Sequence, residues 1–280
     1  FRLRTARALA TALGAEAPAI AAVTPQAWHG LSEDELALLT ASSPVEVAEV
    51  WPLSPLQEGV YYQCTYTDDV NTYLAQNVFD FDHRLDVDAL RVAFGALLTR
   101  HDNLRAGFTS DDLPRPVQYV GRFVPATVAE VDLSNLTADA AEAQLAVVMR
   151  TDSETPFDLR MPPLVRLTVI RLPGRGDRLL LTCHFLLWDG WSRELVLREL
   201  FALYNSGGLR GALPAATATY ADYLRWVSAQ DRAASARAWS EALAGLDQLT
   251  LVAPPEGTGA EPVMPQRVYG ELSAEITALL

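Results

Sequence analysis

Two apolar segments joined by a tight turn constrain the fold of this chain more than any other feature. Residues 164–171 and 178–186 are rich in aliphatic side chains and have the length of strands. Residues 173–177 between them carry a proline and two glycines, which is typical of a turn. Residues 192–204 are helical in composition and are followed by Asn205-Ser-Gly-Gly208, which ends a helix well. We therefore expect a strand hairpin that leads directly into a helix.

Helix and strand patterns alternate along the rest of the chain from Trp51 onward. The clearest helix is 86–101, where Asp86 is a suitable N-cap and apolar side chains recur at helical spacing. Further helices are expected at 56–64, at 139–150 and, as one or two helices, within 220–246. Further strands are expected at 73–81, 104–108, 117–120 and 126–131. This mixture predicts an α/β fold class.

Residues 1–45 differ in composition from the chain that follows. The stretch 4–13 is rich in alanine, and a stretch with prolines comes after it. Ser32 and Glu35 have the spacing of a capping box, which predicts a short helix that ends before Pro44. We expect this segment to be an upstream linker or the tail of a carrier protein.

Composition and charge argue against several classes of function. The net charge of −13 at pH 7 is unsuited to nucleic acid, whose phosphates attract clustered basic residues. No apolar run approaches the roughly 20 residues of a membrane-spanning helix, so we expect no membrane partner and a cytoplasmic location. Cys64 and Cys183 fit reduced core thiols, although a bridge between them stays open. No spacing of Cys and His residues resembles a metal site, and we predict no bound metal.

His184 and Asp189 are the residues in which chemistry is most readily placed. The apolar strand carries His184 near its end, and Asp189 and Gly190 form a turn before the helix. A histidine held there can act as a general base if a carboxylate or carbonyl fixes its tautomer. The same spacing also suits a buried core histidine and an aspartate in a turn, so the residues alone leave both interpretations open.

The segment His184-Phe-Leu-Leu-Trp-Asp-Gly190 resembles the HHxxxDG motif of condensation-type domains from nonribosomal peptide synthetases, in the chloramphenicol acetyltransferase-like superfamily. Four more segments resemble motifs of this family and occur in the family's order: WPLSPLQEG at 51–59, RHDNLRAGF at 100–108, PFDLRMPPLVR at 156–166 and YADYLRW at 220–226. The resemblance implies an α+β two-layer sandwich that is repeated in two similar lobes.

The resemblance also implies a division of the chain and a set of partners. Residues 46–215 would form the N-terminal lobe, and residues 216–280 would form inter-lobe helices and the start of a truncated C-terminal lobe. The missing part of that lobe, or a second chain, is then expected in the native protein. Peptidyl carrier protein domains are the expected partners, with substrates linked to their phosphopantetheine and no cofactor bound directly.

The chain departs from the family motif at Phe185, which stands where the family has its second His, the residue to which catalysis is assigned. A phenyl ring neither accepts nor donates a proton. His184 takes the first His position, and neighbours in a strand face opposite sides, so it replaces the base only if the strand bulges or slips in register. By resemblance, Asp189 is structural and pairs with Arg105, while Gly190 permits the turn.

Two functions from different classes follow. The first is a docking or recruitment module that is impaired in peptide-bond formation. It would hold a trans-acting oxygenase or hydroxylase near carrier-bound peptide. The phenylalanine at position 185 favours this function. The alternative is an active condensation domain, an acyltransferase that joins a carrier-bound acyl or peptidyl donor to a carrier-bound amine by positioning. The otherwise intact motifs favour that alternative. An engineered substitution at residue 185 is a third explanation for the phenylalanine.

Overall fold

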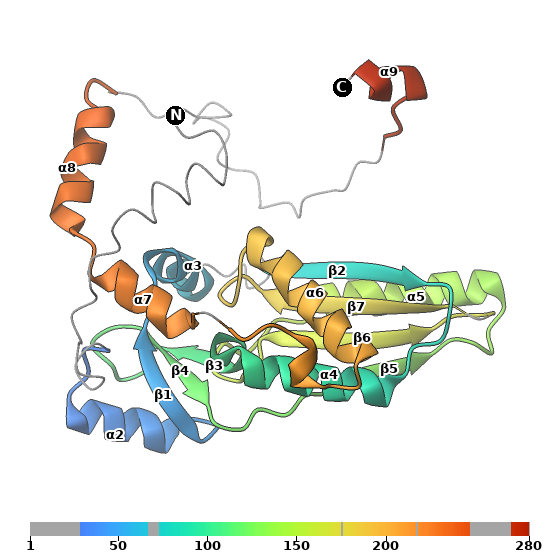
Figure 1. Cartoon of the computed structure of the whole chain (residues 1–280), viewed down its shortest axis with the longest axis horizontal. Coiled ribbons are helices and arrows are strands. Elements are labelled where there is room, and N and C mark those ends of the chain that lie inside the picture. The colour runs from blue at the N-terminus through green and yellow to red at the C-terminus, as the bar shows by residue number, and fades with distance from the viewer. Residues whose placement is uncertain (1–28, 67–72, 175, 217, 247–269, 280) are drawn as a thin grey trace. The chain divides into compact units, whose positions relative to one another are not determined.

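The structure, a computed structural model, describes residues 29–66, 73–174, 176–216, 218–246 and 270–279 (Figure 1). The chain divides into two compact units, Phe1–Gln230 and Asp231–Leu280. Within the described residues, the strands all belong to the first unit and form a four-stranded and a three-stranded sheet.

The four-stranded sheet carries the hairpin that the sequence predicts. Its strands are β2 (Leu74–Phe81), β7 (Asp177–His184), β6 (Val165–Arg171) and β5 (Val128–Asp132), in that spatial order. β7 runs antiparallel to both β2 and β6, whereas β5 and β6 are parallel. The register places Leu74 opposite His184, so the site-bearing end of β7 lies beside the start of β2.

Helices cover both faces of this sheet. α4 (Val87–Arg100) and α6 (Gly190–Asn205) lie together on one face, and α5 (Ala138–Glu154) lies on the other (Figure 1). Alternation along β7 explains the two layers of core, because Leu179 and Leu181 join the cluster that contains the α4 and α6 side chains, while Leu180 joins the cluster with α5. The central strand is therefore buried on both faces.

The three-stranded sheet has the order β1 (Val47–Pro52), β4 (Val117–Gly121) and β3 (Ala106–Thr109), and its pairs are antiparallel. The helix α3 (Pro55–Tyr66) follows β1, and the 3₁₀ turn η1 (Asp102–Arg105) joins α4 to β3. A second 3₁₀ turn, η2 (Arg210–Ala212), follows α6.

Two further helices pack against β1 and β4. Leu39 of α2 (Glu33–Ser42) shares a cluster with Val50, and Leu224 of α7 (Tyr220–Ser228) shares another with Trp51. α2 thus contributes to the core of the first unit, which also includes α7. The expected boundaries at residues 45 and 215 stay predictions.

The described part of the second unit consists of α8 (Arg232–Ala242) and α9 (Ala274–Leu279). Neither helix has a buried residue whose side chain is described. The α/β fold class is confirmed, and each predicted strand and helix from residue 56 to 204 is present within a few residues of its expected bounds. The sequence pattern missed β1, which is short and ends at Pro52. No helix in the described residues has the length and apolar character needed to cross a membrane.

Candidate functional site

The candidate site is the loop of residues 185–189, which joins the end of β7 to the start of α6. The backbone N–H of His184 donates to the carbonyl of Leu164 at 3.0 Å, and the N–H of Phe185 donates to the carbonyl of Tyr73 at 2.9 Å. Consecutive residues thus bond to opposite neighbours, as in a continued strand. Their side chains separate accordingly: His184 is 2% exposed, whereas Phe185 is 42% exposed.

Both ring nitrogens of His184 contact other atoms of the protein. Nδ1 accepts a hydrogen bond from the backbone N–H of Leu186 at 3.2 Å, which places the ring proton on Nε2. Nε2 lies 3.6 Å from Sγ of Cys64, and the ring meets Phe157 edge-on at 6.5 Å between centroids. Burial lowers the pKa of His184 to about 4. The ring is therefore neutral at pH 7 and has no free lone pair to accept a substrate proton.

The two cysteines are free thiols, one of them at this site. Cys64 in α3 is half-buried against His184, and Cys183 is the buried neighbour of His184 in β7. Burial raises the pKa of both thiols, that of Cys183 to about 12. Neither is a thiolate at pH 7, so neither supplies a nucleophile here. No group of three potential metal ligands occurs within the portion that the structure describes.

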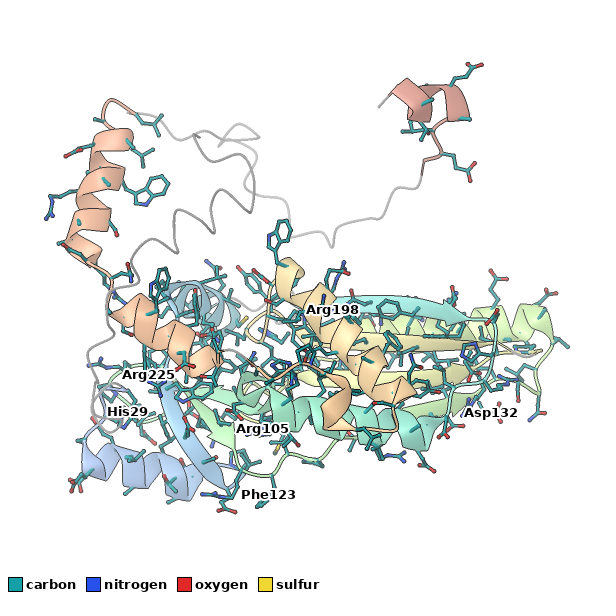
Figure 2. The ribbon with its side chains drawn as sticks, in the orientation of Figure 1. His29, Arg105, Phe123, Asp132, Arg198 and Arg225 are labelled. Carbon is teal, nitrogen blue, oxygen red and sulfur yellow. The ribbon has the colours of Figure 1, made fainter. Side chains whose placement is uncertain are left out.

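Asp189 caps α6 and makes no ion pair with Arg105. Its Oδ1 accepts from the backbone N–H of Ser192 at 2.8 Å, and this bond holds the pKa of the carboxyl below its usual value. Arg105 lies at the end of η1, between α4 and β3 (Figure 2), and pairs with Asp102 at 2.7 Å. Its Nε also donates to the carbonyl of Gly121 at 3.0 Å. The expected Arg105–Asp189 pair is absent because these local partners occupy the guanidinium.

Gly190 begins α6, and its geometry does not require a glycine. Its φ lies outside the left-handed region, and a Cβ added there would meet no heavy atom within 4 Å. The turn at Gly190 therefore does not depend on the conformational freedom of glycine. Leu186, Leu187 and Trp188 are buried, so Phe185 is the exposed apolar side chain of the loop.

Two residues that the sequence analysis did not single out donate hydrogen bonds to the backbone of this loop. Nε2 of Gln57 donates to the carbonyl of Leu186 at 2.8 Å, and Nδ2 of Asn103 donates to the carbonyl of Leu187 at 3.1 Å. Both lie within the segments 51–59 and 100–108 that carry the family resemblance. Their position within these segments was the only sign in the sequence that they matter to the site. The spacing of residues along the chain does not predict that the amide of Gln57 or of Asn103 reaches the loop.

Comparison with known proteins identifies the family. The family model described as "Condensation domain" matches residues 47–280. This chain belongs to the condensation domain family. Among curated relatives, one linear gramicidin synthase protein of Brevibacillus parabrevis is 33% identical over 221 residues, which are 79% of this chain and 3% of that protein. Gramicidin S synthase 2 of Aneurinibacillus migulanus is 28% identical over 203 residues, which are 72% of this chain and 5% of that protein.

Solved structures of condensation-type domains have the same fold. The EpoB nonribosomal peptide synthetase cyclization-docking bidomain from Sorangium cellulosum matches with a TM-score of 0.61 and 24% identity, over 76% of this chain and 47% of that chain. A mutant of the starter condensation domain of rhizomide synthetase matches with a TM-score of 0.64 and 18% identity, over 85% and 52% of the two chains. The expected chloramphenicol acetyltransferase-like fold is thus confirmed, and this chain spans about half the length of these structures.

Proposed function

We propose that this condensation domain is impaired in peptide-bond formation and acts as a docking or recruitment module for carrier-bound peptide and a tailoring enzyme. One observation carries the proposal: the exposed side chain that follows β7 is a phenyl ring, and the adjacent imidazole of His184 is buried and fully engaged. By family resemblance, Phe185 stands at the position of the catalytic second His.

The absence of a base at residue 185 lowers the expected rate of peptide-bond formation. General-base catalysis contributes roughly 10²- to 10⁴-fold to rate. Phe185 has no lone pair for the proton of an attacking amine. His184 is a poor substitute because its Nδ1 already accepts from Leu186 and the residue is 2% exposed. The Asp189 carboxylate is engaged as the cap of α6. Positioning alone would remain to this domain.

The exposed face of α6 supports the docking part of the proposal. Trp191 is 90% exposed and Leu195 is 40% exposed, and their spacing of four residues puts them on one side of the helix. Arg198, labelled on α6 in Figure 2, is exposed one turn further along. Exposed aromatic and arginine side chains are enriched where proteins bind partners. The proposed partners are peptidyl carrier domains with phosphopantetheine-linked substrates, and an oxygenase or hydroxylase.

A working condensation domain is the second candidate. The hydrogen bonding of the loop favours it, because Gln57 and Asn103 donate to the carbonyls of Leu186 and Leu187 and neither bond involves the side chain at 185. Such a domain would join a carrier-bound donor to a carrier-bound amine by proximity and orientation. In either case we propose that a second lobe faces this one in the native protein, as the greater length of the structural neighbours suggests.

The experiment that separates the two candidates is a condensation assay with donor and acceptor loaded on carrier proteins. It compares the wild type with Phe185→His and with Phe123→His, a matched control at an exposed phenylalanine between β4 and β5 (Figure 2). The docking proposal predicts product at the level of the uncatalysed blank for the wild type and for Phe123→His. Steady product formation by the wild type would establish the active condensation domain instead.

Recruitment is tested separately by binding. The domain, joined to a loaded carrier protein, is mixed with oxygenases or hydroxylases encoded near its gene, and complexes are isolated by size exclusion. We expect one of these enzymes to co-elute, and Trp191→Ala to weaken the complex relative to Phe123→Ala. Failure of every candidate enzyme to bind, together with measurable condensation, would refute the recruitment role.

A further inference from the structure

Two consecutive peptide carbonyls in the loop 185–189 are bonded by side chains from distant parts of the chain. Gln57 of α3 donates to the carbonyl of Leu186 at 2.8 Å from 129 residues away in sequence. Asn103 of η1 donates to the carbonyl of Leu187 at 3.1 Å from 84 residues away. The course of the loop therefore depends on tertiary hydrogen bonds, which the loop's own sequence does not supply.

Gln57 is itself fixed by a buried network. Its side chain is 5% exposed, and its Oε1 accepts from the backbone N–H of Ser54 and from Nε2 of Gln118, each at 3.0 Å. Gln118 is 0% exposed and also donates to the carbonyl of Pro52 at 2.8 Å. If the Gln57 amide swung away from Leu186, it would leave buried polar groups without partners, which is costly.

The side chains of the loop complete the restraint. Leu186, Leu187 and Trp188 are 2%, 4% and 7% exposed, and they pack in the cluster that contains the α4 and α6 side chains. A rotation that redirected Phe185 would pull these apolar groups from the core and break both carbonyl bonds. The backbone therefore presents residue 185 outward and keeps the next three side chains inside.

We propose that Gln57 and Asn103 are positioning residues that clamp the loop 185–189, so that the backbone, and not the side chain at 185, sets the direction in which residue 185 points. The proposal goes beyond the docking function, because the clamp serves a docking module and an active condensation domain equally. It also explains how the loop keeps its path when the side chain at residue 185 is a phenyl ring.

The substitution Gln57→Glu tests the clamp with a side chain of nearly the same shape. A carboxylate has no N–H, so it would place an oxygen against the carbonyl of Leu186 and against Oε1 of Gln118, both of which are acceptors. Protonation of the introduced carboxyl at lower pH supplies an O–H donor again. Gln144→Glu is the matched control, because Gln144 is an exposed amide in α5.

The measurement is amide hydrogen exchange, resolved by residue and expressed as protection factors, on the full chain at pH 8 and pH 5. In Gln57→Glu at pH 8 we expect the protection of the Leu186 N–H to fall about tenfold, while the α4 amides of Leu97 and Leu98 keep theirs. The loss at Leu186 should shrink at pH 5, a rescue that a purely structural defect would not show. Wild type and Gln144→Glu should keep full protection.

Two results would overturn the proposal. One is unchanged protection at Leu186, and the other is an equal fall at Leu186, Leu97 and Leu98, which would mark Gln57 as an ordinary stabilising residue. If Gln57→Glu does not fold, Asn103→Asp tests the proposal instead, because Asn103 is the half-buried donor to the carbonyl of Leu187. Asn135→Asp at an exposed position is its control. The same local loss at the loop is expected there, and its absence would reject the clamp.

Discussion

His184 and Phe185 are neighbours in the chain, but they meet opposite environments because strand alternation carries over, without a bulge, from His184 at the end of β7 to Phe185. The eight residue pairs between β2 and β7 are in continuous register up to His184, and the N–H of Phe185 bonds to Tyr73 in the next step. Residue 184 therefore faces inward and residue 185 faces outward. The imidazole in this segment is therefore on the buried side of the strand end.

A pH-dependent contribution to stability follows from the buried ring of His184. Its pKa is about 4 in the folded chain and about 6.5 when exposed, so the unfolded state binds more protons and stability falls as pH drops from about 6.5 to about 4. Relative to its own value at pH 7.5, the wild type should lose about 2 kcal/mol more unfolding free energy at pH 5 than His184→Asn. Urea unfolding at the two pH values measures this, and parallel losses in both proteins would contradict it.

At the scale of elements, the start of α6 depends on Asp189 as a cap and not as an ionic partner. Asp189→Ala should lower the free energy of unfolding by about 1 kcal/mol, because the N–H of Ser192 loses its acceptor. Asp189→Asn should preserve most of the stability, because its carbonyl oxygen can accept the same bond. Thermal and urea denaturation test the pair. Equal destabilisation by Ala and Asn would show that the charge is what matters.

The contact between α4 and α6 contains a nearly buried carboxylate. Oε2 of Glu199 accepts from Nε of Arg100 at 2.8 Å and lies 2.6 Å from Nε2 of His101. Burial alone raises the pKa of Glu199, but the hydrogen bonds from Arg100 and His101 bring it below its usual value. The carboxylate therefore stays ionised at pH 7.

Removing that carboxylate should weaken the helix pair markedly. We expect Glu199→Ala to cost about 3 kcal/mol of unfolding free energy, since it leaves the partly buried Arg100 without its carboxylate partner. Glu194→Ala on the same helix should cost less than about 0.5 kcal/mol, because the Arg193–Glu194 pair is exposed to solvent. Urea unfolding compares them, and similar losses in both variants would contradict this account of the α4–α6 contact.

The elements and the site differ in how far sequence could predict them. The 164–171 and 178–186 hairpin and the helix from residue 86 follow from local patterns, because apolar periodicity and caps are properties of short segments. The opposite facing of His184 and Phe185 follows from strand alternation. The partners of Arg105 and the clamp from Gln57 and Asn103 do not follow, because they depend on which distant segments meet in three dimensions.

At the scale of the whole molecule, the first compact unit contains the buried core that the structure describes. The described side chains of the second unit, Asp231–Leu280, include none that are buried. A chain ending at Gln230 should therefore unfold cooperatively. Its free energy of unfolding should lie within about 0.5 kcal/mol of that of the 280-residue chain. Circular dichroism during urea unfolding checks this, and a loss of several kcal/mol or of cooperativity would show that the second unit stabilises the first.

The imidazole of His184 is buried beside the loop, whereas the exposed position next to it, residue 185, carries no base. Nitrogen-15 NMR of the histidine rings, followed from pH 8 to pH 5 in the wild type and in Phe185→His, tests this arrangement most directly. We predict that His184 stays neutral with its proton on Nε2 across this range, and that the imidazole introduced at 185 titrates near 6.5. Titration of His184 near 6.5 in the wild type, or a proton on its Nδ1, would contradict the account.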